Sequence, residues 1–188
     1  VSDRTELRDL YCSNNRLSTL NLSGTHVKTL WCENNQLTSL NIPGNWLENL
    51  DCSDNKIASL NLSGMYSLEK IVCNNNALTS LTLYGLSDLE YLKCNNNKLT
   101  SLSLSGLNSL QELYCYDNAI TNTVALEAWS NISPHKGQVL PQRRETDNSG
   151  NTGNTGNNGN AGNAGNNGNS NTPATVTGSW KHNSKGWW

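Results

Sequence analysis

The sequence lacks several features that would point directly to a class of function. No apolar run approaches the roughly 20 residues that a membrane-spanning helix requires. Acidic and basic residues nearly balance, with a formal net charge of -2, and no basic stripe of the kind that binds nucleic acid is present. These absences argue against a membrane-spanning segment and against a nucleic-acid-binding protein.

Histidine is also scarce. His26, His135 and His182 fall in three different segments of the chain, so their spacing yields neither a metal cluster nor a histidine-activated nucleophile. The acidic residues fall mostly at outward repeat positions, where a solvated charge is the simplest interpretation. We therefore expect no enzyme activity, no metal and no cofactor.

The chain opens Val1-Ser2-Asp3, with neither an initiator methionine nor a signal peptide. We interpret it as an excised piece of a longer protein. Because an unprotected first repeat would expose its apolar edge, we expect a cap upstream of it.

The sequence does contain one pattern repeated six times, in which an apolar pair precedes a cysteine and an asparagine follows it three residues later. Successive cysteines are 20, 20, 21, 21 and 21 residues apart. Self-similarity at this period predicts a solenoid. The repeated residues are Cys12, Cys32, Cys52, Cys73, Cys94 and Cys115, with Asn15, Asn35, Asn55, Asn76, Asn97 and Asn118.

Each copy predicts one short strand. In Leu10-Tyr11-Cys12 the outer two residues are expected to point inward and the middle one outward. Stacked copies would pair these strands as a parallel sheet, the concave wall of the solenoid. The second half of each copy leaves no room for a helix of ordinary length. We therefore expect a mostly β leucine-rich-repeat solenoid of about six repeats, with short extended or 3₁₀ segments on the back and a glycine at each turn.

The repeated polar and sulfur positions have structural explanations. Inward asparagines can form a ladder that satisfies backbone groups of their own and the neighbouring coil. Stacked cysteines would have Cβ atoms about as far apart as the strands, beyond the usual disulfide range of roughly 3.5–4.5 Å. We expect buried free thiols, with an occasional bridge between adjacent coils as the alternative, and no zinc site because no histidine joins them.

The pattern L-x-x-L-x-C-x-x-N-x-L-x-x-L-x-L in Leu89 to Leu104 resembles a leucine-rich repeat in which cysteine replaces the commoner leucine. The stretch CNNNKLTSLSLSG at 94–106 is similar to repeats of bacterial surface proteins, the group that includes the internalin-like adhesins. The resemblance covers about residues 5–127. It implies an extracellular arc that binds other molecules, without naming a ligand.

Composition divides the chain into four segments: a solenoid at 1–130, a capping segment at 131–145, a flexible Asn/Gly-rich linker at 146–173 and a tryptophan-rich end at 174–188. We expect a helical or irregular turn near 124–129 and a final edge strand within 132–141. The end segment, with Trp180, Trp187 and Trp188, resembles the opening of an aromatic cell-wall-binding repeat. In that family the aromatics stack on wall glycans; the alternative is a tail without function.

We expect binding specificity to depend on the positions that vary from repeat to repeat, on the outward side of the strands. Exposed aromatic residues on a rigid sheet provide contact area at small entropic cost, so a protein or peptide ligand fits best and a glycan is possible. The candidate residues are Tyr11, Trp31, Asp51, Val72, Lys93 and Tyr114 between the inward positions, flanked by Glu33, Tyr91 and Tyr116.

The leading hypothesis is a monomeric, non-catalytic binding module on a bacterial surface, attached to the cell wall through its C-terminal region. The alternative is a structural spacer or accessory region of a larger secreted, wall-attached enzyme. A third possibility, a cytosolic interaction protein, is favoured by the free cysteines and opposed by the linker and the tryptophan-rich end.

Overall fold

The computed structural model describes residues 7–143. The expected linker at 146–173 and the end segment with Trp180, Trp187 and Trp188 lie outside the described residues. The four segment boundaries therefore stay predictions.

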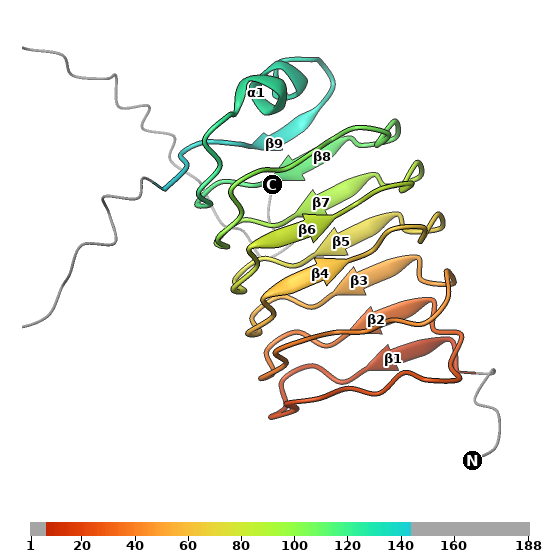
Figure 1. Ribbon diagram of the computed structural model, residues 1–188. Coiled ribbons are helices and arrows are strands. Elements are labelled where there is room, and N and C mark those ends of the chain that lie inside the picture. Colours follow the sequence, from red (N-terminus) through yellow and green to blue (C-terminus); the bar gives the residue numbers. More distant parts are fainter. Residues whose placement is uncertain (1–6, 144–188) are drawn as a thin grey trace, which may run out of the picture. The chain divides into compact units, whose positions relative to one another are not determined.

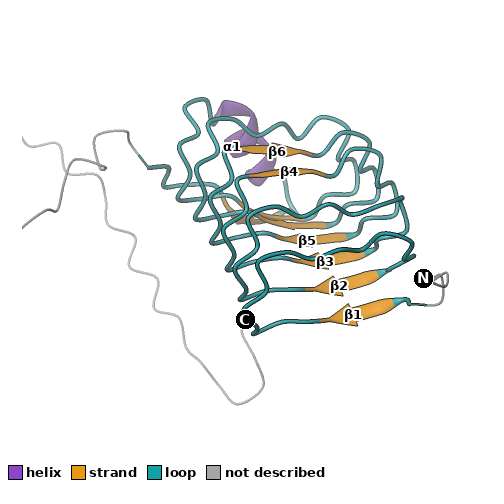
Figure 2. Ribbon diagram, turned by 60° about the horizontal axis from the view of Figure 1, so that its bottom comes forward, coloured by secondary structure: helices purple, strands orange, loops and turns teal. Residues whose placement is uncertain are grey.

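The described chain is a parallel β-solenoid, as the repeat predicted (Figure 1). Seven three-residue strands form its main sheet: β1 (Asp9–Tyr11), β2 (Thr29–Trp31), β3 (Asn49–Asp51), β5 (Lys70–Val72), β7 (Tyr91–Lys93), β8 (Glu112–Tyr114) and β9 (Lys136–Gln138). Figure 2 shows β4 (Ser59–Asn61) and β6 (Ser80–Thr82) paired on the opposite wall. Over residues 7–143 the remaining back segments are irregular and none is a 3₁₀ helix.

The register places equivalent repeat positions side by side. Leu10 pairs with Leu30, Leu30 with Leu50, and Leu50 with Ile71. The same inward position is therefore filled by an aliphatic residue in every coil, and from Leu30 onward these side chains are fully buried. The glycines at the turns, from Gly24 to Gly106, have φ between +73° and +86°, as expected for residues without a Cβ.

The cysteines line the core beside the leucines. Cys32, Cys52, Cys73, Cys94 and Cys115 are fully buried, whereas Cys12, in the first described coil, is partly exposed. All six are free thiols. Burial raises the pKa of the Cys32 and Cys115 thiols to about 12, and it raises the pKa of the three thiols between them well above the ordinary value. The row thus behaves as small apolar side chains that stay protonated at neutral pH.

The expected asparagine ladder is present, and it joins consecutive coils. The Asn97 amide Nδ2 donates to the Cys94 carbonyl of its own coil and to the Cys73 carbonyl of the coil before, each at 3.0 Å. Its Oδ1 accepts from the backbone N–H of Leu78, also in the coil before. One side chain therefore satisfies groups on two coils, and the same three partners recur at Asn35, Asn76 and Asn118.

A glutamine outside the repeat completes this ladder. Gln142 Nε2 donates to the Cys115 carbonyl at 2.9 Å, and Gln142 Oε1 accepts from the Asn118 backbone N–H at 3.2 Å. The donation to Cys115 is the role that an asparagine of a seventh coil would have, whereas the group that Gln142 accepts from is the N–H of Asn118 and not that of Ile120, the position equivalent to Leu78. Gln142 was not predicted, because it has no counterpart at a repeat position.

Residues 124–143, which comprise helix α1 and strand β9, cover the last coil (Figure 1). Helix α1 (Val124–Ser130) buries Leu126, and β9 adds the expected edge strand parallel to β8. Gly137 in β9 has a φ of +144°, and a Cβ there would lie 1.8 Å from the Leu113 carbonyl oxygen. Only glycine allows this close pairing.

The structure contains a second ladder of amide and carboxylate side chains that was not predicted from the sequence. The residue two positions after each cysteine adopts positive φ, between +52° and +57°, a conformation that asparagine and aspartate tolerate best after glycine. Asn34 Nδ2 donates to Asn14 Oδ1, and Asn75 Nδ2 donates to Asp54 Oδ1, so these exposed side chains also link adjacent coils. The signal was present, since all six positions are Asn or Asp.

Replacing Asn97 with alanine should lower the free energy of unfolding by about 2–4 kcal/mol, because it removes several buried hydrogen bonds and leaves the Leu78 N–H without its acceptor. Asn15→Ala is the matched control. Asn15 is exposed, and among the described residues it bonds only within its own turn, so its loss should cost less than about 1 kcal/mol. Urea unfolding followed by circular dichroism measures both, and equal losses would contradict the ladder's role.

Stability should fall at alkaline pH, because the buried thiols stay protonated while thiols of the unfolded chain ionise above about pH 8.5. The stabilisation is fully present below that pH. Each further pH unit costs about 1.4 kcal/mol per buried thiol until the folded pKa is reached. Urea midpoints between pH 7 and 10.5 measure this slope, and a Cys52→Ala/Cys73→Ala/Cys94→Ala variant should show a shallower one. Identical slopes would disprove the thiol contribution.

Candidate binding face

The outward side chains of the main sheet form three columns, which we call the sheet face. The central column contains the middle residue of each strand. One flanking column contains the first residue of each strand, and the other contains the residue that follows each cysteine. The central column is Tyr11, Trp31, Asp51, Val72, Lys93 and Tyr114; the first flanking column is Asp9, Thr29, Asn49, Lys70, Tyr91 and Glu112; the second is Ser13, Glu33, Ser53, Asn74, Asn95 and Tyr116.

One end of the sheet face is aromatic. Tyr11 and Trp31 meet edge to face, with ring centroids 5.0 Å apart, and 61% and 47% of their surfaces remain exposed. Such exposure is uncommon for large aromatic residues on a rigid sheet and is typical of contact surfaces.

The middle of the sheet face is hollowed. Trp31, Glu33, Asn49, Leu50, Asp51 and Lys70 line an open depression of about 230 Å³. Asp51 Oδ1 accepts hydrogen bonds from the Ser53 backbone N–H at 3.0 Å and from Ser53 Oγ at 2.6 Å. Ser13 Oγ donates to Glu33 Oε2. Within residues 7–143 the ion pairs are Lys28 with Glu48 and Lys136 with Glu112, so neither carboxylate of the hollow is paired with a described cation.

The other end carries the tyrosines. Tyr91 and Tyr114 have ring centroids 5.9 Å apart, and the Lys70 ammonium lies 5.3 Å from the Tyr91 centroid. Burial raises the pKa of Tyr91 to about 12, and nearby negative charges, including those of Glu112 and Asp51, add to this shift. Both phenols therefore remain neutral at physiological pH, because burial also raises the pKa of Tyr114.

The structure places all nine residues predicted for the concave face on this one surface. The six central residues follow one another strand by strand, and Glu33, Tyr91 and Tyr116 flank them, each half-buried. In the second flanking column, however, Ser53, Asn74 and Asn95 are buried, so they present little surface to a ligand. Asn74 Oδ1 and Asn95 Oδ1 have no hydrogen-bond partner within residues 7–143.

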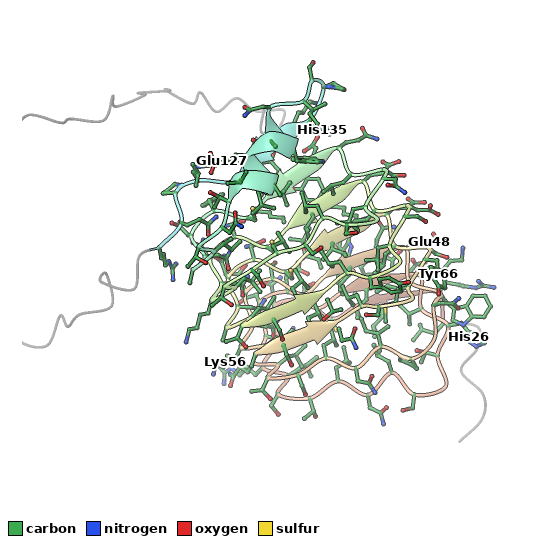
Figure 3. The ribbon with its side chains drawn as sticks, turned by 45° about the horizontal axis from the view of Figure 1, so that its top comes forward. His26, Glu48, Lys56, Tyr66, Glu127 and His135 are labelled. Carbon is green, nitrogen blue, oxygen red and sulfur yellow. The ribbon has the colours of Figure 1, made fainter. Side chains whose placement is uncertain are left out.

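A second group of exposed aromatic residues was missed by the sequence reasoning. Trp46, Tyr66 and Tyr84 lie at the turns near the recurring glycines, and the Trp46 ring centroid is 4.9 Å from that of His26. Figure 3 shows His26 and Tyr66 at one edge of the coils, with Lys56 at the opposite edge. A signal existed, since His26, Trp46 and Tyr66 each follow a turn glycine by two residues.

Other kinds of site find no support in the part of the chain that the structure describes. No group of three or more His, Cys, Asp or Glu side chains is placed to hold a metal ion. No described helix has the length and apolar character needed to cross a membrane.

Neither a protein-family model nor a curated protein matches the sequence. Among solved structures, the chain is similar to the functional domain of InlJ from Listeria monocytogenes, which includes a cysteine ladder, at 26% sequence identity and a TM-score of 0.40. The match covers 63% of this chain and 36% of that one, so the chain spans about a third of its length. A superposition at this level establishes neither a shared family nor a shared function.

Proposed function

We propose that this chain is a non-catalytic binding module that recognises a protein or peptide, with a glycan as the second ligand class, through the sheet face. The observation that carries the proposal is the uninterrupted central column from Tyr11 to Tyr114. Exposed Tyr11 and Trp31 stand at one end and half-buried Tyr114 at the other, and the charges between them form no ion pair within residues 7–143. Such a surface combines contact area with charge complementarity.

The dimensions of the sheet face suit a macromolecular ligand. Five strand spacings of roughly 4.8 Å separate Tyr11 from Tyr114, which makes the column about 24 Å long. That length is comparable to the width of a patch of about 800 Å², the usual contribution of one partner to a stable interface. A small molecule would occupy only a fraction of it.

The coil framework supports recognition by holding the side chains in place before a ligand arrives. Each strand is fixed by backbone pairing to its neighbours and by the asparagine ladder behind it. Less side-chain and backbone freedom is then lost on binding, and more of the contact free energy contributes to affinity.

We further propose an extracellular, bacterial-surface location, with attachment to the cell wall through the region that contains Trp180, Trp187 and Trp188. Free cysteines are more usual in proteins inside the cell. Here burial raises the pKa of the thiols and keeps them in the unreactive protonated form, so they can persist as thiols in an oxidising environment.

The proposal predicts that a ligand of the full chain depends on the sheet face. A panel of extracellular protein domains, peptides and glycans would be screened against the wild type and a Tyr11→Ala/Trp31→Ala/Tyr114→Ala variant. Removing three anchors should weaken binding by at least about 100-fold, since an interface anchor is worth roughly 1–2 kcal/mol or more. Surface plasmon resonance gives the affinities, and circular dichroism verifies the fold.

The matched control is Trp46→Ala/Tyr66→Ala/Tyr84→Ala, which removes as many exposed aromatic residues from the turns. It should bind like the wild type. A ligand that binds the sheet-face variant but not this control would show that the binding site lies at the turns. No ligand in the panel, with the fold intact, would favour the structural spacer or accessory region of a larger enzyme.

A further inference from the structure

We propose that the hollow between Trp31 and Lys70 receives a lysine or arginine side chain of a protein partner. This inference rests on the proposed function and assigns the central position of the sheet face to one kind of chemistry. It follows from the hollow's lining, which combines an exposed indole with two carboxylates that no described cation neutralises.

The indole supplies one wall. Trp31 is held by its edge-to-face contact with Tyr11, and nearly half of its surface remains open. A tryptophan ring attracts an ammonium or guanidinium group placed within about 6 Å of its face, more strongly than the other aromatic side chains do. The apolar stem of a lysine or arginine would pack on the same ring.

The carboxylates supply the charge, and each is already oriented. Ser53 holds Asp51 through Oδ1, and Ser13 holds Glu33 through Oε2. The second oxygen of each carboxylate has no hydrogen-bond partner among the described residues. Two preoriented oxygens are therefore available to a donor that enters the hollow, and charged donors form the stronger hydrogen bonds.

Lys70 does not neutralise this site, although it belongs to the lining. Its ammonium is directed to the other side, over the Tyr91 ring, and it forms no ion pair in the described chain. With two carboxylates and one ammonium, the lining has a formal charge of -1. The negative charge of Asp51 also acts on neighbouring groups, and it adds to the effect of burial in raising the pKa of Tyr91 and Cys73.

Other occupants fit the hollow less well. An anion would face the two carboxylates. A divalent metal ion requires a fuller set of oxygen ligands, and no described group of three acidic or histidine side chains converges here. A single organic cation with an apolar stem matches the indole, the carboxylates and the open volume together.

Defined peptides test the inference on the full-length, ¹⁵N-labelled chain. The probes are acetyl-Gly-Gly-X-Gly-Gly-amide with X as arginine, lysine, citrulline or glutamate. The Trp31 indole N–H resonance, assigned with Trp31→Phe, reports occupation of the hollow. The arginine and lysine peptides should shift it with affinities in the millimolar range, whereas citrulline, which keeps the shape of arginine without its charge, should bind at least about ten-fold more weakly.

Three substitutions give opposite directions of change. Asp51→Asn and Glu33→Gln keep an oxygen for the serine donors and should each weaken the arginine peptide at least about five-fold. Lys70→Met removes the lining's own cation and should strengthen it about two- to five-fold, which a merely structural role of the hollow would not produce. Asp88→Asn/Glu90→Gln removes two exposed acids outside the hollow and should change nothing.

Equal binding of the arginine and citrulline peptides, or unchanged binding in Asp51→Asn and Glu33→Gln, would overturn the inference. If glucosamine oligomers shift the Trp31 indole resonance and none of the four peptides does, the occupant of the hollow would be a glycan amine and not a protein side chain. A partner from the screen could fail to bind the triple sheet-face variant but still bind Asp51→Asn/Glu33→Gln. That result would support the proposed function and contradict this inference alone.

Discussion

The structure depends on one interaction, the bridge that each repeated asparagine from Asn35 onward makes between its own coil and the coil before. A turn as short as these exposes backbone carbonyl and N–H groups toward the interior, where no water replaces a missing partner. The primary amide meets both needs, since Nδ2 donates to two cysteine carbonyls while Oδ1 accepts a backbone N–H of the preceding coil. The leucines and cysteines can then pack in identical layers, because the polar groups around them are satisfied.

That arrangement separates the residues that stabilise the solenoid from those on the sheet face. Inward positions are fixed by the ladder and by burial, so they repeat with little variation from coil to coil. Outward positions on the same strands have no such structural role, and the central ones vary along the solenoid, from Tyr11 through Asp51 to Lys93. The free energy of folding therefore resides behind the sheet, and the residues on its surface can vary without disturbing the core.

Most of the fold could be predicted from the sequence. The repeat period, the alternation within each strand and the hydrogen-bonding needs of the buried asparagine amides each indicated it. Short-range periodicity could not reveal Gln142, because its role depends on the path of the cap and not on a repeat position. For the candidate site, the strand alternation identified the central column, but alternation alone could not show that Asn74 and Asn95 beside it are buried. The pairing of Trp31 with two carboxylates in one hollow could not be predicted either, because it depends on side-chain directions across three coils.

The ladder also has a direction. Every bridging asparagine reaches back toward the N-terminus, so a coil acquires its last hydrogen bonds only from residues that follow it in the chain. On a ribosome, which releases the N-terminus first, each coil would close about one repeat behind its own emergence. The sixth coil would wait longest, because Gln142 lies 27 residues beyond Cys115. The last segment of this solenoid to be synthesised is therefore also the one that completes its folding.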